Sequence, residues 1–145
     1  VLARLQMAAD SVQKKQYEAA RREYRAVADD PAAPKGLRDF ATMQAAALSI
    51  GTVPYKTLAA ELDSYRTGTS AWRFSAKEIL GLSAFSEGDT SDAERLFGEI
   101  VSDGGAPQGM RQRAEVLLAL LLEKEKPAQA ETTGKKDAAN DTKTQ

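Results

Sequence analysis

Few residues in this sequence could carry out chemistry, because it contains no cysteine and no histidine. Their absence excludes thiol nucleophiles, Ser-His and Cys-His triads, and nearly all zinc and haem sites. Carboxylates remain, and Glu78 with Glu87 or Asp89 could in principle form a general acid and base pair. The spacing puts Glu87 and Asp89 at a turn beyond the helix that carries Glu78, without an apolar pocket around either acid. We therefore expect solvated charges, no enzymatic activity, no metal and no cofactor.

Charge is nearly balanced, with 20 Lys and Arg against 21 Asp and Glu, so we expect no nucleic-acid partner. One stretch, residues 14–25, is locally basic and could face anionic lipid headgroups, although such a run is more often a solvated helix face. No apolar run reaches the 18 residues of a membrane span. The amphipathic pattern is already running at Leu2, so we expect a chain cut from a longer protein, with any membrane anchor upstream.

The elements that must position these residues are helices, since Gly or Pro clusters recur between stretches of helical periodicity. No comparable stretch alternates like a strand. We expect Thr52 to cap the fourth helix, and Ser91 with Glu94 to form a capping box on the sixth. The seven predicted helices cover about residues 2–15, 17–29, 36–50, 52–67, 70–87, 89–103 and 107–126.

The end of the chain differs in composition from the rest. Residues 127–145 contain no Val, Ile, Leu, Met, Phe, Tyr or Trp. Such a segment cannot bury enough apolar area to offset the entropy lost on ordering. The predicted organisation is therefore a helical domain over residues 1–126 and a disordered polar tail over residues 127–145.

The sequence repeats itself. Residues 16–27 align with residues 89–100, and the matching apolar positions are all 73 residues apart. Those pairs are Ala20 with Ala93, Tyr24 with Phe97, and Val27 with Ile100. A spacing of two units of about 34 residues, with some loop length added, is typical of stacked helical repeats.

These residues resemble the tetratricopeptide repeat, in which small residues, a turn Gly and an aromatic recur in a fixed order. Gly81, Gly88, Ala93 and Phe97 meet the pattern in order. In the first unit Ala8, Ala20 and Tyr24 take the same places, but Lys15 stands where the turn Gly is expected. The middle unit, residues 36–66, is repeat-like by position only. The resemblance implies an all-α fold, a right-handed solenoid of three helix pairs plus a C-terminal capping helix.

A narrower resemblance rests on residues 72–84, followed by Glu87, Gly88, Asp89 and Ala93. This run is similar to the periplasmic domain of bacterial ancillary Sec-translocon subunits. What that similarity implies is a membrane-anchored protein on the periplasmic side of the inner membrane, with the translocon or periplasmic chaperones as partners. The absence of cysteine by itself fits a cytoplasmic protein as well as a periplasmic one.

In such a solenoid the first helix of each pair forms the concave wall, which is the default ligand surface. A shallow apolar groove for a peptide is one interpretation of its residues. The other is that Leu5, Leu48 and Leu82 simply pack against neighbouring helices. The predicted groove residues are Leu5, Ala9, Val12, Ala41, Ala45, Leu48, Glu78, Leu82 and Phe85.

Two apolar features stand outside that groove. Tyr65, Trp72 and Phe74 surround the turn into the fifth helix, either as a binding hot spot or as the joint between two units. In the seventh helix, residues 116–122 are all apolar, although a capping helix needs only one such face. Val116, Leu120 and Leu122 are therefore expected to face outward and to contact another chain.

Two functions are consistent with these features. The first is a non-enzymatic scaffold that binds a protein or peptide partner through the groove. The second is a structural module that forms homo-oligomers and has no separate ligand groove.

Overall fold

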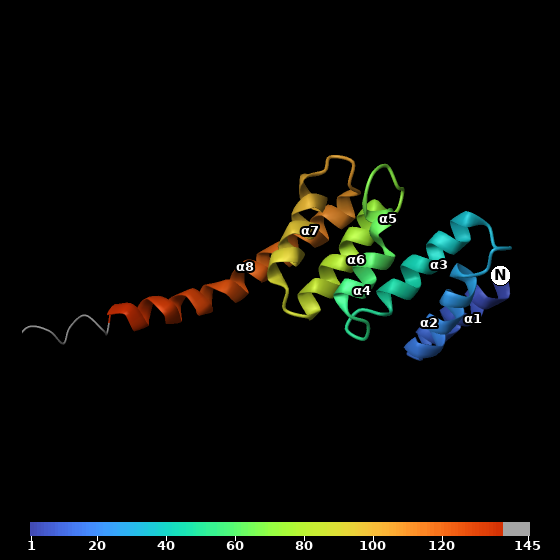
Figure 1. Ribbon diagram of the computed structural model, residues 1–145, viewed down its shortest axis with the longest axis horizontal. Helices are drawn as coiled ribbons and strands as arrows, with labels where there is room; N and C mark the ends of the chain where they lie inside the picture. The colour runs from blue at the N-terminus through green and yellow to red at the C-terminus, as the bar shows by residue number, and fades with distance from the viewer. Residues whose placement is uncertain (138–145) are drawn as a thin grey trace, which may run out of the picture.

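The computed structural model describes the backbone of residues 1–137 and the side chains of residues 1–124. This part of the chain is all-helical and has no strand. The helices run from α1 and α2 at one end of the molecule to α8 at the other (Figure 1). They are α1 (Leu2–Gln13), α2 (Tyr17–Ala28), α3 (Lys35–Ala47), α4 (Tyr55–Glu61), α5 (Asp63–Arg66), α6 (Arg73–Ser86), α7 (Thr90–Ser102) and α8 (Gln108–Asp137).

Periodic burial explains why these segments are helices. In α2 the buried residues are Ala20, Tyr24 and Val27, which recur at helical spacing on one face. The corresponding face of α7 includes Ala93, Leu96, Phe97 and Ile100. Each amphipathic helix must place this face against another helix, so the sequence pattern leads directly to packed helical pairs.

Two helices begin directly after a proline. Pro34 and Pro54 are the residues before α3 and α4, and both have extended backbone angles. Proline disfavours helix in the residue before it, so α4 begins at Tyr55 and not at the predicted cap, Thr52. The Thr52 hydroxyl instead donates to the Ser49 carbonyl at 3.1 Å.

The remaining helix ends also differ in detail from the predictions. The predicted fourth helix is divided at Leu62 into α4 and α5. At the start of α7 the cap is Asp89, whose carboxylate accepts a hydrogen bond from the Asp92 backbone N–H at 3.1 Å. The predicted capping box of Ser91 and Glu94 is therefore not formed, because Asp89 already occupies the capping position.

The turns inside the outer helix pairs have a shared backbone conformation. Gly88, between α6 and α7, has φ of 80°. Lys15, between α1 and α2, has φ of 57° and is the one non-glycine residue with positive φ among the described residues. The position 73 residues before the turn glycine thus adopts the same left-handed conformation without being glycine.

Consecutive helices pack on each other at both ends of the described chain, whereas α3 and α4 have little direct contact. The most extensive contacts join α1 to α2, α2 to α3, α6 to α7 and α7 to α8. Smaller contacts join α3 and α4 to α6, and α6 to α8. Two apolar clusters result, and α3 contributes to both: Ala41 and Ala45 belong to the cluster with α1 and α2, whereas Met43 and Ala46 belong to the cluster with α4, α6, α7 and α8.

A close approach of two helices is centred on Gly81 of α6. An ideal Cβ built at Gly81 would lie 2.6 Å from Cε1 of Phe97, and the Phe97 ring is fully buried. Ala93, also fully buried, lies one turn before Phe97 on α7. Small residues at 81 and 93 therefore leave the space that the aromatic ring occupies.

The last helix, α8, covers the end of the larger apolar cluster. Its inner face follows the prediction, since Ala114 and Leu121 are buried while Met110, Leu117 and Leu118 pack against the cluster. The predicted end near Lys126 differs, because α8 continues to Asp137 and extends away from the other helices (Figure 1). This stretch combines helix-favouring Ala, Gln, Glu and Lys with Pro127 and Gly134, which disfavour a helix, so its composition does not explain the continuation. The predicted tail residues 138–145 lie outside the described residues.

Candidate protein-binding surfaces

A polar cleft lies between α3 and the segment that joins α5 to α6. Its volume is about 690 Å³. The first half of α3 supplies one wall, and the end of α5 with the turn into α6 supplies the other. The side chains around it are Ala28, Lys35, Arg38, Asp39, Thr42, Ser64, Tyr65, Ser70, Ala71 and Trp72. Basic, hydroxyl and aromatic groups are thus gathered in one concavity.

Asp39 joins the two walls of this cleft. Its carboxylate accepts hydrogen bonds from Lys35 Nζ and, at 2.9 Å, from the Tyr65 hydroxyl. Burial raises the pKa of Asp39, but the hydrogen bonds from Lys35 and Tyr65 outweigh it and hold the pKa below its ordinary value. Burial, with the bond to Asp39, raises the pKa of Tyr65. Asp39 therefore stays charged, and its charge is already satisfied within the protein.

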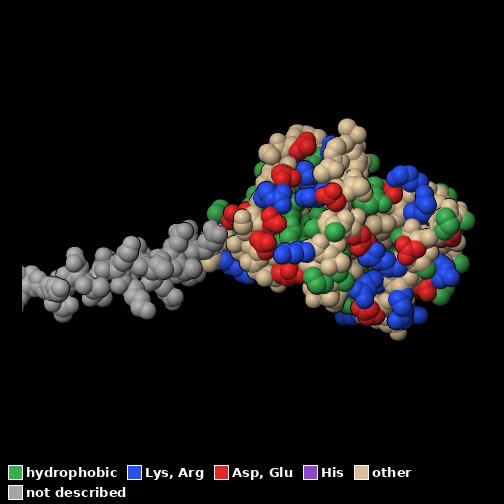
Figure 2. All heavy atoms as spheres, viewed as in Figure 1, with side chains coloured by type: hydrophobic (Ala, Val, Ile, Leu, Met, Phe, Trp, Pro, Cys, Tyr) green, Lys and Arg blue, Asp and Glu red, His purple; other side chains and the backbone are tan. Residues whose placement is uncertain are grey.

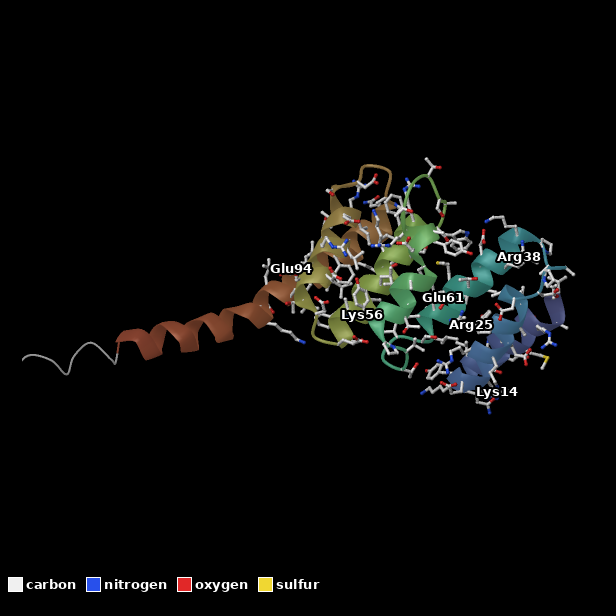
Figure 3. The ribbon with its side chains drawn as sticks, in the orientation of Figure 1. Lys14, Arg25, Arg38, Lys56, Glu61 and Glu94 are labelled. Atoms are coloured by element: carbon white, nitrogen blue, oxygen red, sulfur yellow. The ribbon has the colours of Figure 1, made fainter. Side chains whose placement is uncertain are left out.

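Arg38 and Trp72 remain available to a ligand. The guanidinium of Arg38, which is labelled on α3 in Figure 3, makes no hydrogen bond or ion pair with another described residue, whereas its backbone carbonyl accepts a hydrogen bond from the Thr42 hydroxyl. Trp72 is half-buried, and its ring packs against Phe40 with centroids 6.5 Å apart. A fixed indole near an unpaired guanidinium can hold an apolar group and a carboxylate together, and Trp and Arg are enriched among residues that dominate binding energy.

A second surface is an apolar groove of about 610 Å³ between α6 and α8. Leu82 on α6 and Val116 and Leu117 on α8 give it its apolar character. At one side Arg113 forms a two-pronged ion pair with Glu78, with Nε to Oε1 at 2.6 Å and Nη2 to Oε2 at 3.1 Å. The structure thus brings the predicted groove residues Glu78 and Leu82 together with the predicted interface residue Val116.

All three predicted interface residues of α8 are exposed. The exposed fractions are 61% for Val116, 46% for Leu120 and 58% for Leu122. Leu122 does not share a face with the other two, because at 100° per residue it is turned about 200° from Leu120. Exposed apolar side chains in contact with each other mark interaction surfaces, so Val116 and Leu120 are the stronger pair.

The other predicted groove residues do not form one surface. Ala41 and Ala45 have no exposed area, because α3 uses this small-residue face to pack against α2. That part of the predicted groove is corrected. Leu5 and Leu48 pack against the same apolar cluster, which agrees with the alternative interpretation of these residues.

Three predicted residues remain near solvent without joining the cleft or the α6–α8 groove. Ala9 is half-buried and Val12 is 36% exposed, both on α1. Phe85 packs against the larger cluster, and Lys124 Nζ lies 4.4 Å from its ring centroid. Within the described residues, the predicted groove residues therefore do not line one continuous concavity.

The carboxylates considered for acid and base chemistry have other partners. Glu78 pairs with Arg113, and Glu87 accepts a hydrogen bond from the Tyr55 backbone N–H at 2.6 Å. Asp89 caps α7. Within the described residues, no cluster of three or more acidic side chains is placed to hold a metal ion. Along the same part of the chain, no helix is both long enough and apolar enough to cross a membrane.

The basic stretch on α2 is partly neutralised. Arg21 pairs with Glu18 at 2.7 Å, and Arg25 pairs with Glu61 of α4, Nη2 to Oε2 at 2.8 Å (Figure 3). The hydrogen bond to Glu61 raises the pKa of Arg25 further. Basic and acidic side chains are interspersed over this end of the molecule (Figure 2). This arrangement favours the solvated-face interpretation over a lipid-binding strip.

The sequence predicts only some of the residues that line the polar cleft. Trp72 and Tyr65 stood out as aromatics at a turn, and they do lie at the joint of α3 with α6. Lys35, Thr42 and Ser70 were not singled out. The spacing of Lys35 and Asp39, four residues apart on one helix face, was the signal that could have pointed to this wall.

Comparisons of the chain with protein-family models, curated proteins and solved structures give no significant match. The function is therefore inferred from these surfaces.

Proposed function

We propose that this chain is a non-enzymatic scaffold that binds a segment of a partner protein in the cleft between α3 and α6. The observation that supports it best is that Arg38, whose guanidinium has no partner among the described residues, and the packed indole of Trp72 line the same cleft. An acidic side chain of the partner binds Arg38, and a neighbouring apolar side chain packs on Trp72. The cleft volume of about 690 Å³ fits a few residues of a peptide.

The fold proposed to carry this cleft is a right-handed, tetratricopeptide-repeat-like solenoid. Its three helix pairs are α1 with α2, α3 with α4, and α6 with α7, and α8 caps the last pair. Support comes from the extensive packing of α1 on α2 and of α6 on α7, and from the matching left-handed turns at Lys15 and Gly88. The middle pair is assigned by its position in the chain, since α3 and α4 each contact α6 and have little direct contact with each other. In such a fold α3 and α6 are successive first helices, so the cleft lies between adjacent units.

We place the scaffold on the periplasmic side of a bacterial inner membrane, assisting secreted proteins at the Sec translocon or with periplasmic chaperones. This setting rests on the resemblance of residues 72–84. The cleft itself does not depend on the setting.

Peptide selection tests the binding function. A displayed library of random peptides is selected on the immobilised full chain, and the recovered peptides are measured by calorimetry. We expect peptides with an acidic residue near an apolar one. Arg38→Glu and Trp72→Ala should each weaken them at least tenfold, or about 1.4 kcal/mol, because each removes one half of the site.

The matched control is Arg22→Glu, which makes the same charge reversal at an exposed arginine on α2, outside the cleft. It should change the affinity less than twofold. Peptides that bind the Arg38→Glu protein as tightly as the parent would contradict the proposed site.

The alternative function is a homo-oligomerisation module. The exposure of Val116 and Leu120 on one face of α8 is the observation that favours it. Because α8 and the cleft are separate surfaces, self-association and partner binding are compatible in one molecule.

A further inference from the structure

One exposed stripe of α8 has a charge pattern of its own. Arg113, Val116, Leu120 and Glu123 are spaced three, four and three residues apart, which places them along one side of the helix. All four are exposed. We call these four residues the α8 seam. It is positive at its N-terminal end, apolar in the middle and negative at its C-terminal end.

This order is self-complementary when a second helix runs in the opposite direction. Centred on residue 118, antiparallel pairing sets Val116 against Leu120 and Arg113 against Glu123, and two-fold symmetry makes each pair twice. Parallel pairing in register would instead oppose Arg113 to Arg113 and Glu123 to Glu123. Charge complementarity therefore selects the antiparallel arrangement.

The seam borders the apolar groove between α6 and α8. Val116 and Arg113 also line the apolar groove, with Leu82 on the side of α6. Gly109, one turn before Arg113, continues the line of the seam without a side chain. Arg113 binds Glu78 through Nε and Nη2, so its Nη1 is left to donate to a second carboxylate.

We propose that two copies of this chain form an antiparallel dimer in which the α8 seams pair, with Val116 of each copy against Leu120 of the other. The dimer uses a surface other than the cleft between α3 and α6, so it goes beyond the proposed binding function. Its formation places two clefts in one particle, which raises the effective affinity for a partner that presents two segments.

Sedimentation equilibrium of the full chain, from micromolar to millimolar concentration, tests the dimer. We expect a reversible monomer–dimer equilibrium. Val116→Glu/Leu120→Glu should raise its dissociation constant at least tenfold, because four carboxylates then meet at the centre. The control is Leu122→Glu, which adds one carboxylate per chain at a leucine that is 58% exposed and lies off the seam, and it should leave the dissociation constant within twofold.

Cysteine cross-linking tests the direction of pairing, and the absence of native cysteine gives a clean background. Val116→Cys and Leu120→Cys chains of different mass are mixed and oxidised mildly. The antiparallel seam predicts that the mixed disulfide forms fastest. Circular dichroism of each variant confirms that it is folded before it is compared.

A parent chain that stays monomeric at every concentration would overturn the proposal, even if the selected peptides still bind the cleft. Equal dissociation constants for the parent and the Val116→Glu/Leu120→Glu chain would overturn it as well. Faster formation of the two like disulfides than of the mixed one would exclude the antiparallel register.

Discussion

At the scale of single residues, buried polar groups connect helices that are distant in the sequence. Tyr55 at the start of α4 is only 8% exposed, and its hydroxyl donates to Asp92 of α7 at 2.6 Å. Burial, together with the bond to Asp92, raises the pKa of Tyr55 to about 12. The hydrogen bonds from Tyr55 and Arg95 lower the pKa of Asp92. This contact joins the middle of the chain to its last helix pair.

Tyr55→Phe should lower the free energy of unfolding by about 1 kcal/mol at neutral pH, because it removes a hydrogen bond to a half-exposed carboxylate. The sign of the pH dependence follows from the raised pKa. Below pH 10.0 both states keep the phenol proton, whereas between 10.0 and about 12 the unfolded chain loses it first. The free energy of unfolding of the parent therefore falls as the pH rises, and the difference from Tyr55→Phe becomes smaller. Urea unfolding of both proteins at pH 8 and pH 11 measures this, and a difference that stays constant or widens contradicts the assignment.

Lys15→Gly should stabilise the protein by about 1 kcal/mol. Lys15 adopts a left-handed conformation at φ of 57°, which is unfavourable in free energy for a residue with a Cβ atom and not for glycine. The reciprocal control is Gly88→Lys, at the equivalent turn with φ of 80° and open space around its Cβ position. It should destabilise by a similar amount. Thermal unfolding measures both, and a lower melting temperature for Lys15→Gly would show that the lysine side chain has a role outside the turn.

At the scale of the helices, stability depends on how closely two backbones approach. Gly81→Ala should destabilise by about 1 to 3 kcal/mol, because the new methyl group would lie 2.6 Å from an atom of the buried Phe97 ring, so that the ring or a helix must shift. Gly98→Ala is the matched control, since nothing lies within 4 Å of its Cβ position on α7. It should stabilise by up to about 1 kcal/mol through helix propensity. Denaturant unfolding measures the change in free energy of unfolding for each variant. Equal changes at the two positions would contradict the packing at Gly81.

The helices themselves were largely predictable from the sequence, and their ends were not. Burial at Ala20, Tyr24 and Val27 follows the periodic pattern that predicted α2. The starts of α4 and α7 depend on local competition, between Thr52 and Pro54 in one case and between Asp89 and Ser91 in the other. Composition alone predicted neither the break at Leu62 nor the continuation of α8 to Asp137.

The candidate sites were less predictable, for a physical reason. A helix with two apolar faces does not reveal which neighbour each face meets. Alanine at positions 41 and 45 is compatible with an exposed groove wall and with close helix packing. In the structure both residues are buried where α3 packs against α2. The cleft combines side chains from α3, α5 and the turn before α6, so only the tertiary arrangement brings Arg38 and Trp72 together.

At the scale of the whole molecule, α3 is the element shared by the two apolar clusters. The cleft lies along α3, where the helices of the first cluster meet those of the second. The α8 seam lies at the far end of the larger cluster. This separation allows the proposed dimer to form while the proposed peptide-binding cleft of each copy stays free.

Trp72 provides the most direct measurement of the central claim, because it is the single tryptophan of the chain and it lines the cleft. A peptide from the selection is titrated into the parent while tryptophan fluorescence is followed, and calorimetry is run in parallel. We predict a saturable change in emission with the same dissociation constant as the heat signal, weakened at least tenfold by Arg38→Glu. Binding that calorimetry detects without any change in Trp72 emission would place the peptide elsewhere and contradict the account.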